Sequence, residues 1–471
     1  MYRSILILVT SVLMTGCAAF APAERPDAPL EIPARFTLYG QGEAATGRWW
    51  EAFNSPELNL LVETALAGNF DIRTARARLE QANALAHQAG AVLLPSVDAE
   101  TTAGVTRSHS KATSHGSGVI SDEQSYYAGL AASYEVDLWG RLGADRQAEL
   151  LTAQAAGEDL ASATMTVVAS VVETWIGLLA IDRQIALLED QIKTNETLLN
   201  LEKLRFANGK AQALDVSQQR EALAAAKAQM PLLEIQTQEL RSSLAILLGK
   251  AGADLPITVS SGLPELIALP DAGVPADLLA ARPDVRAAGL RLKAADWLVA
   301  AARADRLPAI TLSAAAAFSS GSLDLLFNNW FLNLAGSITG PLFDAGSRSA
   351  EVARTRAVAQ EYLGDYAQTV AEAVREVEDV LVTEQRQATY IALLQDQLDA
   401  SRMSMKDARL QYLNGQSDYL SYLTAWSSVQ SLQRQLVDEQ ATRIKYRVTL
   451  YRALGGSWSQ EITTPDSAPQ D

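Results

Sequence analysis

LAGNFDIR at residues 66–73, followed by an Ala/Leu-rich run to a Leu-Pro pair at 94–95, returns as LAARPDVR at 279–286, which leads to Leu-Pro at 307–308. The two copies are offset by 213 residues (284 − 71). A second echo, offset by 206 (414 − 208), sets Phe-Ala-Asn-Gly at 206–209 against Tyr-Leu-Asn-Gly at 412–415. The chain is therefore a duplication of roughly 200 residues, far longer than a solenoid repeat, and each copy is too elongated for a globular active site.

The first residues predict the compartment. Arg3 and the apolar run from Ile5 to Leu13 are typical of a secretory signal peptide, here residues 1–16, whose apolar run is too short to span a bilayer. Cys17, the single cysteine, follows small residues at the expected cleavage point, a pattern that resembles a bacterial lipoprotein box. We expect Cys17 to be lipidated and, with Ala18 after it, the protein to reach the outer membrane. The alternative is an idle cysteine in a discarded peptide.

Composition limits the possible functions. A formal net charge of −16 argues against nucleic-acid binding and against a polybasic membrane patch. Three histidines and one cysteine leave little for metal or nucleophile chemistry, and no phosphate loop, zinc spacing or Ser/His/Asp arrangement is present. We therefore expect no enzyme activity, no metal site and no cofactor. Residues 17–48 are expected to form a lipid anchor with a Pro-rich extended tether, and residues 457–471 a flexible tail.

The longest helices are expected where proline is absent, from Val97 to Met230 and from Leu342 to Thr464. Apolar residues at steps of three, four or seven recur in both windows, which argues for coiled-coil packing. At 1.5 Å per residue, each long helix would reach roughly 100 Å. Each should end at an Asn-Gly pair and be followed by a return helix, which predicts helical hairpins over 141–249 and 347–455. Pro231 should kink the first return helix.

Segments of a different period lie between the short and the long helices. Alternating apolar and polar residues predict strands at 96–106, 125–138, 309–319 and 329–343, about the length of transmembrane β-strands. The segment from Arg107 to Gln124 is expected to be an extracellular loop. Alternation alone fits a soluble sheet equally well. In lipid, however, every strand edge must be paired, and four strands cannot close a barrel. Several copies must then share one barrel.

At this point the residues resemble the TolC-type outer-membrane factors of Gram-negative export systems, in particular their lipoprotein, NodT-like branch. The resemblance runs from Trp49-Trp50 to Leu454-Gly455, and its most specific parts are RPDVR at 282–286, DLWGR at 137–141 and PLFDAG at 341–346. It implies two repeats, at 49–262 and 263–456, in a mainly α chain with a membrane β-barrel portion. It further implies a homotrimer with a 12-stranded β-barrel continuous with a 12-helix periplasmic α-barrel. The residues alone permit two or three protomers.

The resemblance also implies a mechanism, which is passive transport through a tripartite efflux pump with no covalent chemistry. A periplasmic adaptor and an inner-membrane pump, probably of the RND type, would engage the tunnel and export drugs or other small solutes. Adaptor contacts are implied at the two hairpin tips. The candidates are Asn208, Gly209, Lys210, Asn414, Gly415 and Gln416. An ordinary helix stop explains both glycines as well.

A closed periplasmic gate is implied on the second return helix. The family places a Leu five and often an Asp nine positions after the tip glycine; here these are Leu420 and Thr424, so the acidic ring is missing at 424. Asp418 and Asp215 stand nearby and are candidates to replace it, because three carboxylates on a symmetry axis repel one another and bind cations. For each Asp, the alternative is a cap at a helix N-terminus.

Three other functions compete with efflux. The same channel could serve a type I protein secretion system, although the lipid anchor favours efflux. A periplasmic coiled-coil scaffold lipoprotein without a pore is disfavoured by two hairpins and four barrel-length strands. A lipid-anchored enzyme is disfavoured because no catalytic constellation is present.

Overall fold

The computed structural model describes residues 22, 31–37, 47–110, 118–252, 262–267, 269–270 and 274–455. The expected signal peptide, Cys17, most of the tether and the tail from 457 lie outside the described residues. The chain forms two compact units. Among the described residues, the first unit consists mainly of Arg78–Ala156 and Ala287–Ala367. The second combines described residues of Leu30–Ala77 and of Gly157–Arg286 with the segment from Gln368 onward. Each unit thus takes segments from both copies.

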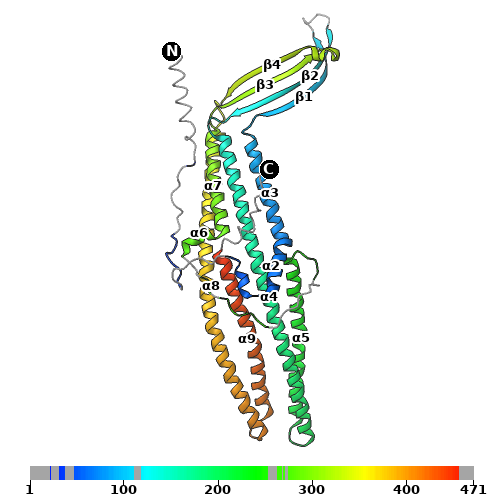
Figure 1. Cartoon of the computed structure of the whole chain (residues 1–471), viewed down its shortest axis with the longest axis vertical. Helices are drawn as coiled ribbons and strands as arrows, with labels where there is room; N and C mark the ends of the chain where they lie inside the picture. The colour runs from blue at the N-terminus through cyan, green and yellow to red at the C-terminus, as the bar shows by residue number, and fades with distance from the viewer. Residues whose placement is uncertain are drawn as a thin grey trace. The chain divides into compact units, whose positions relative to one another are not determined.

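Two helical hairpins, whose first helices begin in the first unit, make up most of the second unit (Figure 1). Helix α4 (Arg141–Ala207) is followed by α5 (Ala213–Leu247), and α8 (Ser347–Leu413) by α9 (Tyr419–Leu454). Pro231 lies inside α5, which is helical on both sides of it. One stretch of α4 is long and apolar enough to cross a bilayer, but 78% of it is buried within the protein. That stretch is therefore a core segment of the helical unit.

The first unit carries one sheet of four antiparallel strands in the order β1-β2-β3-β4. The strands are Ser96–Ser110, Val119–Val136, Ala309–Ser320 and Trp330–Thr339. The prediction of a loop over residues 107–124 is wrong for most of these residues, because β1 and β2 remain paired as far as Ser110 and Val119. There the Arg107 guanidinium forms a cross-strand ion pair with Asp122, at 2.7 Å. Strand β4 is shorter than predicted, since Gly340 and Pro341 follow it and proline cannot donate to a ladder.

Aspartates turn the chain from strand into long helix in both copies. The Asp137 carboxylate accepts hydrogen bonds from the backbone N–H groups of Leu142 and Gly143, at 3.1 and 2.7 Å. Asp344 does the same for Gly346 and Arg348. Unpaired N–H groups at a helix start are stabilised by a carboxylate, so each helix begins where its aspartate caps it.

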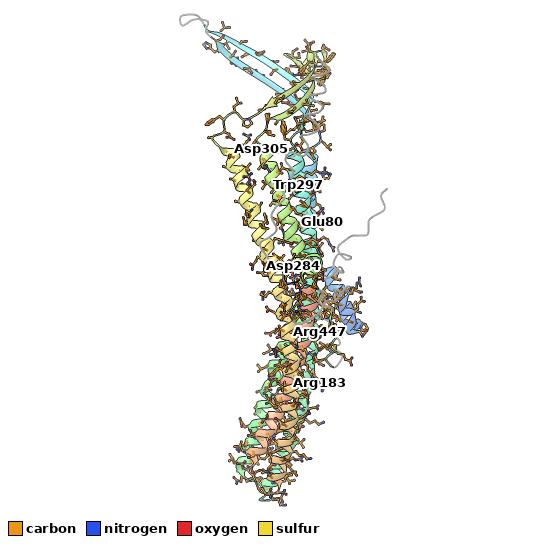
Figure 2. All side chains as sticks on the ribbon, turned by 90° about the vertical axis from the view of Figure 1, so that its left-hand side faces the viewer. Glu80, Arg183, Asp284, Trp297, Asp305 and Arg447 are labelled. Carbon is orange, nitrogen blue, oxygen red and sulfur yellow. The ribbon has the colours of Figure 1, made fainter. Side chains whose placement is uncertain are left out.

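Shorter helices precede the strands: α2 (Pro56–Gly68) and α3 (Phe70–Ala91) in the first copy, α6 (Leu278–Ala281) and α7 (Pro283–Ala304) in the second. In the first unit, small residues let α7 approach α4 closely. Ala294, Ala300 and Ala301 of α7 pack with Ala144 and Ala148 of α4, beside Trp297 (Figure 2). Short 3-10 turns cover Trp49–Phe53, Pro275–Asp277 and Leu323–Asn328.

Candidate functional site: sheet edges, hairpin tips and the packing that supports them

The sheet has two open edges within the described chain. Strands β1 and β4 each pair on one side only, with β2 and β3 respectively. Every residue of β4 is exposed, and so are large apolar side chains on both edge strands. They are Val97, Val105, Trp330, Leu332, Leu334 and Ile338. An exposed apolar strand with free backbone donors and acceptors is a template for pairing with another chain.

The two hairpin tips have the same backbone geometry. Gly209 and Gly415 adopt φ values of 68° and 72°, in the left-handed region that suits glycine. In each tip the N–H after the glycine bonds to a carbonyl five residues back, Lys210 to Arg205 at 2.8 Å and Gln416 to Gln411 at 2.8 Å. The adaptor-contact candidates Asn208, Lys210, Asn414 and Gln416 are exposed, together with both glycines.

The gate candidates separate into two groups. Leu420 is 50% exposed and Thr424, one turn further on, is also exposed. Asp418 is exposed and caps α9, accepting hydrogen bonds from the Ser421 N–H and hydroxyl at 3.0 and 2.6 Å, which lower the pKa of its carboxyl. Asp215 is buried, and its carboxylate accepts the Gln212 N–H at 2.8 Å. Both aspartates thus form hydrogen bonds at a helix N-terminus, which is the alternative to a gate role that the sequence analysis gave for each of them.

Sequence reasoning missed a buried polar cluster that joins the two hairpins near their tips. The Tyr412 hydroxyl donates to Glu202 at 2.6 Å, and the Arg205 guanidinium lies over the Tyr412 ring, 4.7 Å from its centroid. Burial raises the pKa of the Glu202 carboxyl, with Tyr412 and Arg205 opposing it. One signal was visible, since tyrosines at 412, 419 and 422 gather around the second tip and have no tyrosine counterparts at 206, 213 and 216.

A second part of this cluster uses amide side chains. Gln219 is fully buried; its amide donates to the Asn195 carbonyl at 3.0 Å and its oxygen accepts from the Tyr419 hydroxyl at 2.5 Å. Trp426 donates to the Asn195 side chain at 3.1 Å. A buried polar group costs stability unless it is bonded, so these contacts fix how the two hairpins pack against each other.

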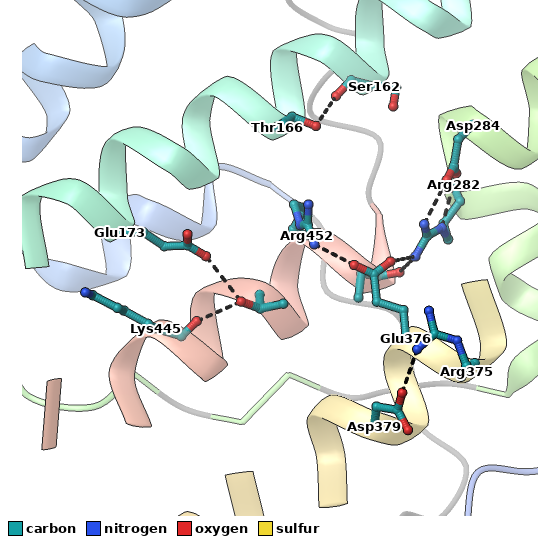
Figure 3. Close-up of polar contacts among 12 residues, drawn as sticks. Ser162, Thr166, Glu173, Arg282, Asp284, Arg375, Glu376, Asp379, Lys445 and Arg452 are labelled. Carbon is teal, nitrogen blue, oxygen red and sulfur yellow. Dashed lines mark hydrogen bonds and ion pairs between the residues drawn. The ribbon is translucent and has the colours of Figure 1, made fainter. Parts of the chain in front are cut away.

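The RPDVR motif is part of a charged junction, shown in Figure 3. Arg282 forms ion pairs with Asp284 and Glu376, both at 2.8 Å, and donates to the Ala453 carbonyl at 2.9 Å. Glu376 also accepts from Arg452 at 2.5 Å. The Arg282 guanidinium holds the pKa of Asp284 below its ordinary value, against the effect of burial. The motif therefore ties the start of α7 to α8 and to the end of α9.

A buried ion pair lies further along the same hairpin. The Arg447 guanidinium (Figure 2) contacts the Glu384 carboxylate, and their side chains are 5% and 6% exposed. Arg447 also donates to the carbonyl of Ile267, in the segment that connects the two copies. This contact fixes part of the connecting segment on the helices.

A cavity of about 610 Å³ is lined by α4, α5 and α9. Its polar side chains include Gln184 and Asp438, which are hydrogen-bonded to each other, and burial raises the pKa of Asp438. Among the described residues, no three His, Cys, Asp or Glu side chains are grouped so that they could hold a metal ion. The side chains that line this cavity provide polar packing between the three helices.

The sequence of this chain was compared with models of known protein families. The outer membrane efflux protein family matches residues 61–250 and 274–456. The chain belongs to this family. The efflux family thus matches both copies of the duplication, and the family predicted from the resemblance is confirmed.

Efflux proteins of other bacteria are similar to this chain over nearly its full length. The pyoverdine export outer membrane protein OpmQ of Pseudomonas putida is 32% identical over 98% of this chain and 99% of its own. The toluene efflux pump outer membrane protein TtgF of the same species is 31% identical over 98% of each chain. The structure of the outer-membrane channel OprN aligns with a TM-score of 0.85 at 28% identity, covering 93% of this chain and 99% of that one.

The protein is therefore an outer-membrane efflux component with a TolC-like fold, as the sequence predicted. Its family and its relatives are efflux proteins and channels, not enzymes.

Proposed function

We propose that three copies of this chain assemble into a passive conduit, a 12-stranded β-barrel continuous with a 12-helix periplasmic tunnel. The open edges of the sheet carry this proposal. A barrel in lipid must close so that no edge is left unpaired, and about eight strands is the minimum for closure. Four strands from one copy are too few, so the missing strands must come from further copies. Three copies reproduce the assembly that the resemblance implies.

The conduit works in this proposal as the outer part of a tripartite efflux pump. A periplasmic adaptor contacts the exposed tips at Asn208–Lys210 and Asn414–Gln416, and an inner-membrane pump of the RND type supplies the driving force. Exposed loops on rigid helices are suited to such docking. The cargo is a small solute, because relatives are named for export of pyoverdine and of toluene. The outer-membrane lipid surrounds the barrel, and lipidation at Cys17 after removal of residues 1–16 adds a second anchor.

The closed state of the conduit is assigned to the first turns of α9. Leu420 and Thr424 are exposed there on one helix face, and Asp418 is exposed beside them. Three copies would bring three leucines and three carboxylates together, which narrows the opening and attracts cations. The burial of Asp215 argues against a lumen-facing role for it.

Conductance and mass test the conduit. The protein purified from outer membranes in detergent should have the mass of three chains, and in planar lipid bilayers it should open discrete conducting channels. A strain lacking the gene should become more sensitive to toxic small solutes and regain resistance with the wild-type copy. A monomer without conductance contradicts the proposal.

The duplication provides a matched control for the gate residue Leu420, because the first copy has an equivalent leucine. Leu214 occupies in the first copy the place of Leu420 in the second and is also exposed, at 59%. Leu420→Ala should raise the open probability in bilayers, whereas Leu214→Ala should leave it closer to wild type. If both variants and the wild type have equal conductance and open probability, Leu420 is not a gate residue.

A further inference from the structure

The 3-10 turn Leu323–Asn328, which joins β3 to β4, exposes several large apolar side chains. Leu323 and Leu325 are exposed, Phe327 is 71% exposed, and Trp330, at the start of β4, is 73% exposed. A contiguous apolar patch on a protein surface marks contact with a membrane, a ligand or another protein. We therefore expect something other than water to cover this turn.

One face of the sheet is apolar and the other is polar. Paired residues of neighbouring strands share a face, so the register places Ala128, Phe318 and Trp330 together. The apolar face also carries Val97, Val105, Leu130, Leu312, Leu334 and Ile338. The polar face carries Asp98, Glu100, Ser133, Glu135, Asn333 and Ser337. The apolar face of a transmembrane barrel contacts lipid and the polar face lines the lumen, so Phe318 and Trp330 belong to the lipid side.

The turn continues the apolar face beyond the end of the β3–β4 pairing. The Phe327 ring packs edge-on against the Phe318 ring, with centroids 5.3 Å apart, and Phe318 lies opposite Trp330. A second aromatic contact, between Tyr127 and Phe331 at 6.4 Å, belongs to the polar face. Aromatic side chains at the ends of lipid-facing strands suit the bilayer interface. The turn therefore extends the lipid side of the sheet, not the lumen side.

The β1–β2 hairpin continues past this turn and becomes charged. Strands β1 and β2 remain paired as far as Ser110 and Val119, beyond the point where β3 and β4 end (Figure 1). On the lipid side of this hairpin the apolar series on β1 ends at Val105, and the next residue on that face, Arg107, forms its exposed ion pair with Asp122. Charged side chains on the lipid face of a barrel are costly at the bilayer midplane and tolerated near the interface. The β1–β2 hairpin should therefore leave the hydrocarbon at this ion pair.

The composition of the β3–β4 turn differs from that of the charged hairpin end. Asp324 is the single charged residue of Leu323–Asn328, and Asn329 then leads into β4. A carboxylate is disfavoured in the centre of a bilayer but can remain at the level of the headgroups. Three exposed apolar side chains beside one carboxylate therefore fit the boundary between acyl chains and headgroups.

We propose that the β3–β4 turn is inserted in the outer leaflet of the outer membrane. Leu323, Leu325 and Phe327 contact lipid acyl chains, and the Asp324 carboxylate remains among the headgroups. This inference rests on the proposed barrel in lipid and adds how the rim of that barrel is held. Each copy contributes one inserted turn beside one β1–β2 hairpin that rises out of the hydrocarbon, so the inserted turns fix the height of the barrel in the membrane.

Fluorescence quenching by lipid tests this contact. Cys17 is the single cysteine of the chain and is lipidated in the proposed mature protein, so a fluorophore can be attached to one new cysteine at a time. Phe327→Cys and Leu325→Cys place it in the turn. Leu334→Cys, on the apolar face of β4, is the control inside the membrane. His109→Cys, on the same face of the sheet but beyond the Arg107 ion pair, is the control outside it.

The full-length variants are reconstituted in phosphatidylcholine vesicles, with or without a spin label on the lipid acyl chains. A spin label near the headgroup should remove most of the fluorescence of Phe327→Cys and Leu325→Cys and leave that of His109→Cys nearly unchanged. A spin label near the end of the acyl chain should instead quench Leu334→Cys most strongly. In intact cells, a membrane-impermeant maleimide should modify His109→Cys and leave Phe327→Cys largely unmodified.

The outcomes separate this inference from the conduit itself. If lipid quenches Leu334→Cys but neither turn variant, the turn is covered by water or by a neighbouring copy, and the inference fails with the barrel intact. Rapid maleimide modification of Phe327→Cys would then identify water as the environment. If Leu334→Cys is not quenched either, the sheet does not lie in lipid and the proposed conduit fails as well. Leu325→Cys keeps the test valid if loss of the Phe327 contact with Phe318 prevents folding.

Discussion

The two copies make the same junction with different chemistry. In the first, the Asn69 amide donates to the Leu247 carbonyl at 2.8 Å; in the second, Arg282 at the equivalent position donates to the equivalent carbonyl, Ala453, at 2.9 Å. Close backbone contacts accompany both, between Gly249 and Gly68 and between Gly455 and Ala281. Both copies therefore share the backbone contact, whereas in the second copy Arg282 also forms ion pairs with Asp284, whose equivalent in the first copy is Asp71, and with Glu376.

Two further positions differ between the copies in the same direction. Glu384 corresponds to Leu178, which is buried and apolar, and buried Tyr412 corresponds to exposed Phe206. Buried ionic and hydroxyl groups are poor sources of stability but are costly when they lose a partner. Substitutions at these particular positions of the second copy should consequently cost more stability than the matched changes in the first copy. The following variants test this asymmetry.

The largest effect is expected at the buried ion pair. Glu384→Leu, which copies the first repeat, leaves the buried Arg447 charge without its carboxylate and should destabilise the protein by about 3–5 kcal/mol. Urea unfolding in detergent, followed by circular dichroism, measures the change in the free energy of unfolding.

The control removes both charges together. Glu384→Leu with Arg447→Leu should recover most of the lost stability, because a well-packed apolar pair is often as stable as a buried ion pair. If the double variant is no more stable than the single one, the connecting segment at Ile267 depends on Arg447 more than on the pair.

The next effect concerns the junction. Arg282→Asn should cost about 2–3 kcal/mol, because Glu376 loses one charged partner and hydrogen bonds to charged groups contribute about 1.5–3 kcal/mol each. Asn69→Ala, the matched change in the first copy, removes a cap and one neutral hydrogen bond and should cost about 1 kcal/mol. Equal losses in the two variants would show that the ion pairs of Arg282 with Asp284 and Glu376 contribute no extra stability.

The tip cluster predicts a pH dependence. The pKa of Glu202 is raised above its ordinary value by burial, so the folded state holds this proton more tightly than the unfolded chain. The contribution of Glu202 to stability is therefore most favourable at low pH and is lost as pH rises through the folded-state pKa. Glu202→Gln removes this loss, so the stability of this variant relative to wild type should increase as the pH rises above about 4, the ordinary pKa of a glutamate carboxyl.

Thermal unfolding of the two proteins across this pH range tests the sign. Tyr412→Phe, which copies Phe206 of the first repeat, is the control: it deletes the hydroxyl that donates to Glu202 and should cost about 1–2 kcal/mol at neutral pH. A constant difference between Glu202→Gln and wild type at all pH values contradicts the assigned burial effect.

Much of the fold could be predicted because it depends on periodic patterns and on the repeat itself. Helix ends at Asn208-Gly209 and Asn414-Gly415 followed from local backbone preference, and the strand alternation placed all four strands. The extent of β1 and β2 was missed, because Ser108 to Ser110 and Ile120 to Glu123 pair through their backbones with little apolar alternation. The Glu202–Tyr412 contact was missed since the two residues are 210 positions apart (412 − 202) and only packing of the hairpins brings them together.

The smallest expected effect is the one that the two copies should share. Gly209→Ala and Gly415→Ala each force a side chain into the left-handed region, where an L-residue costs about 1–2 kcal/mol relative to glycine. Open space surrounds both positions, so backbone strain is the whole cost and the two variants should lose equal stability in the same urea titration. A larger loss at Gly415 would mean that the tyrosine cluster beside the second tip extends the asymmetry of the two copies into the turn itself.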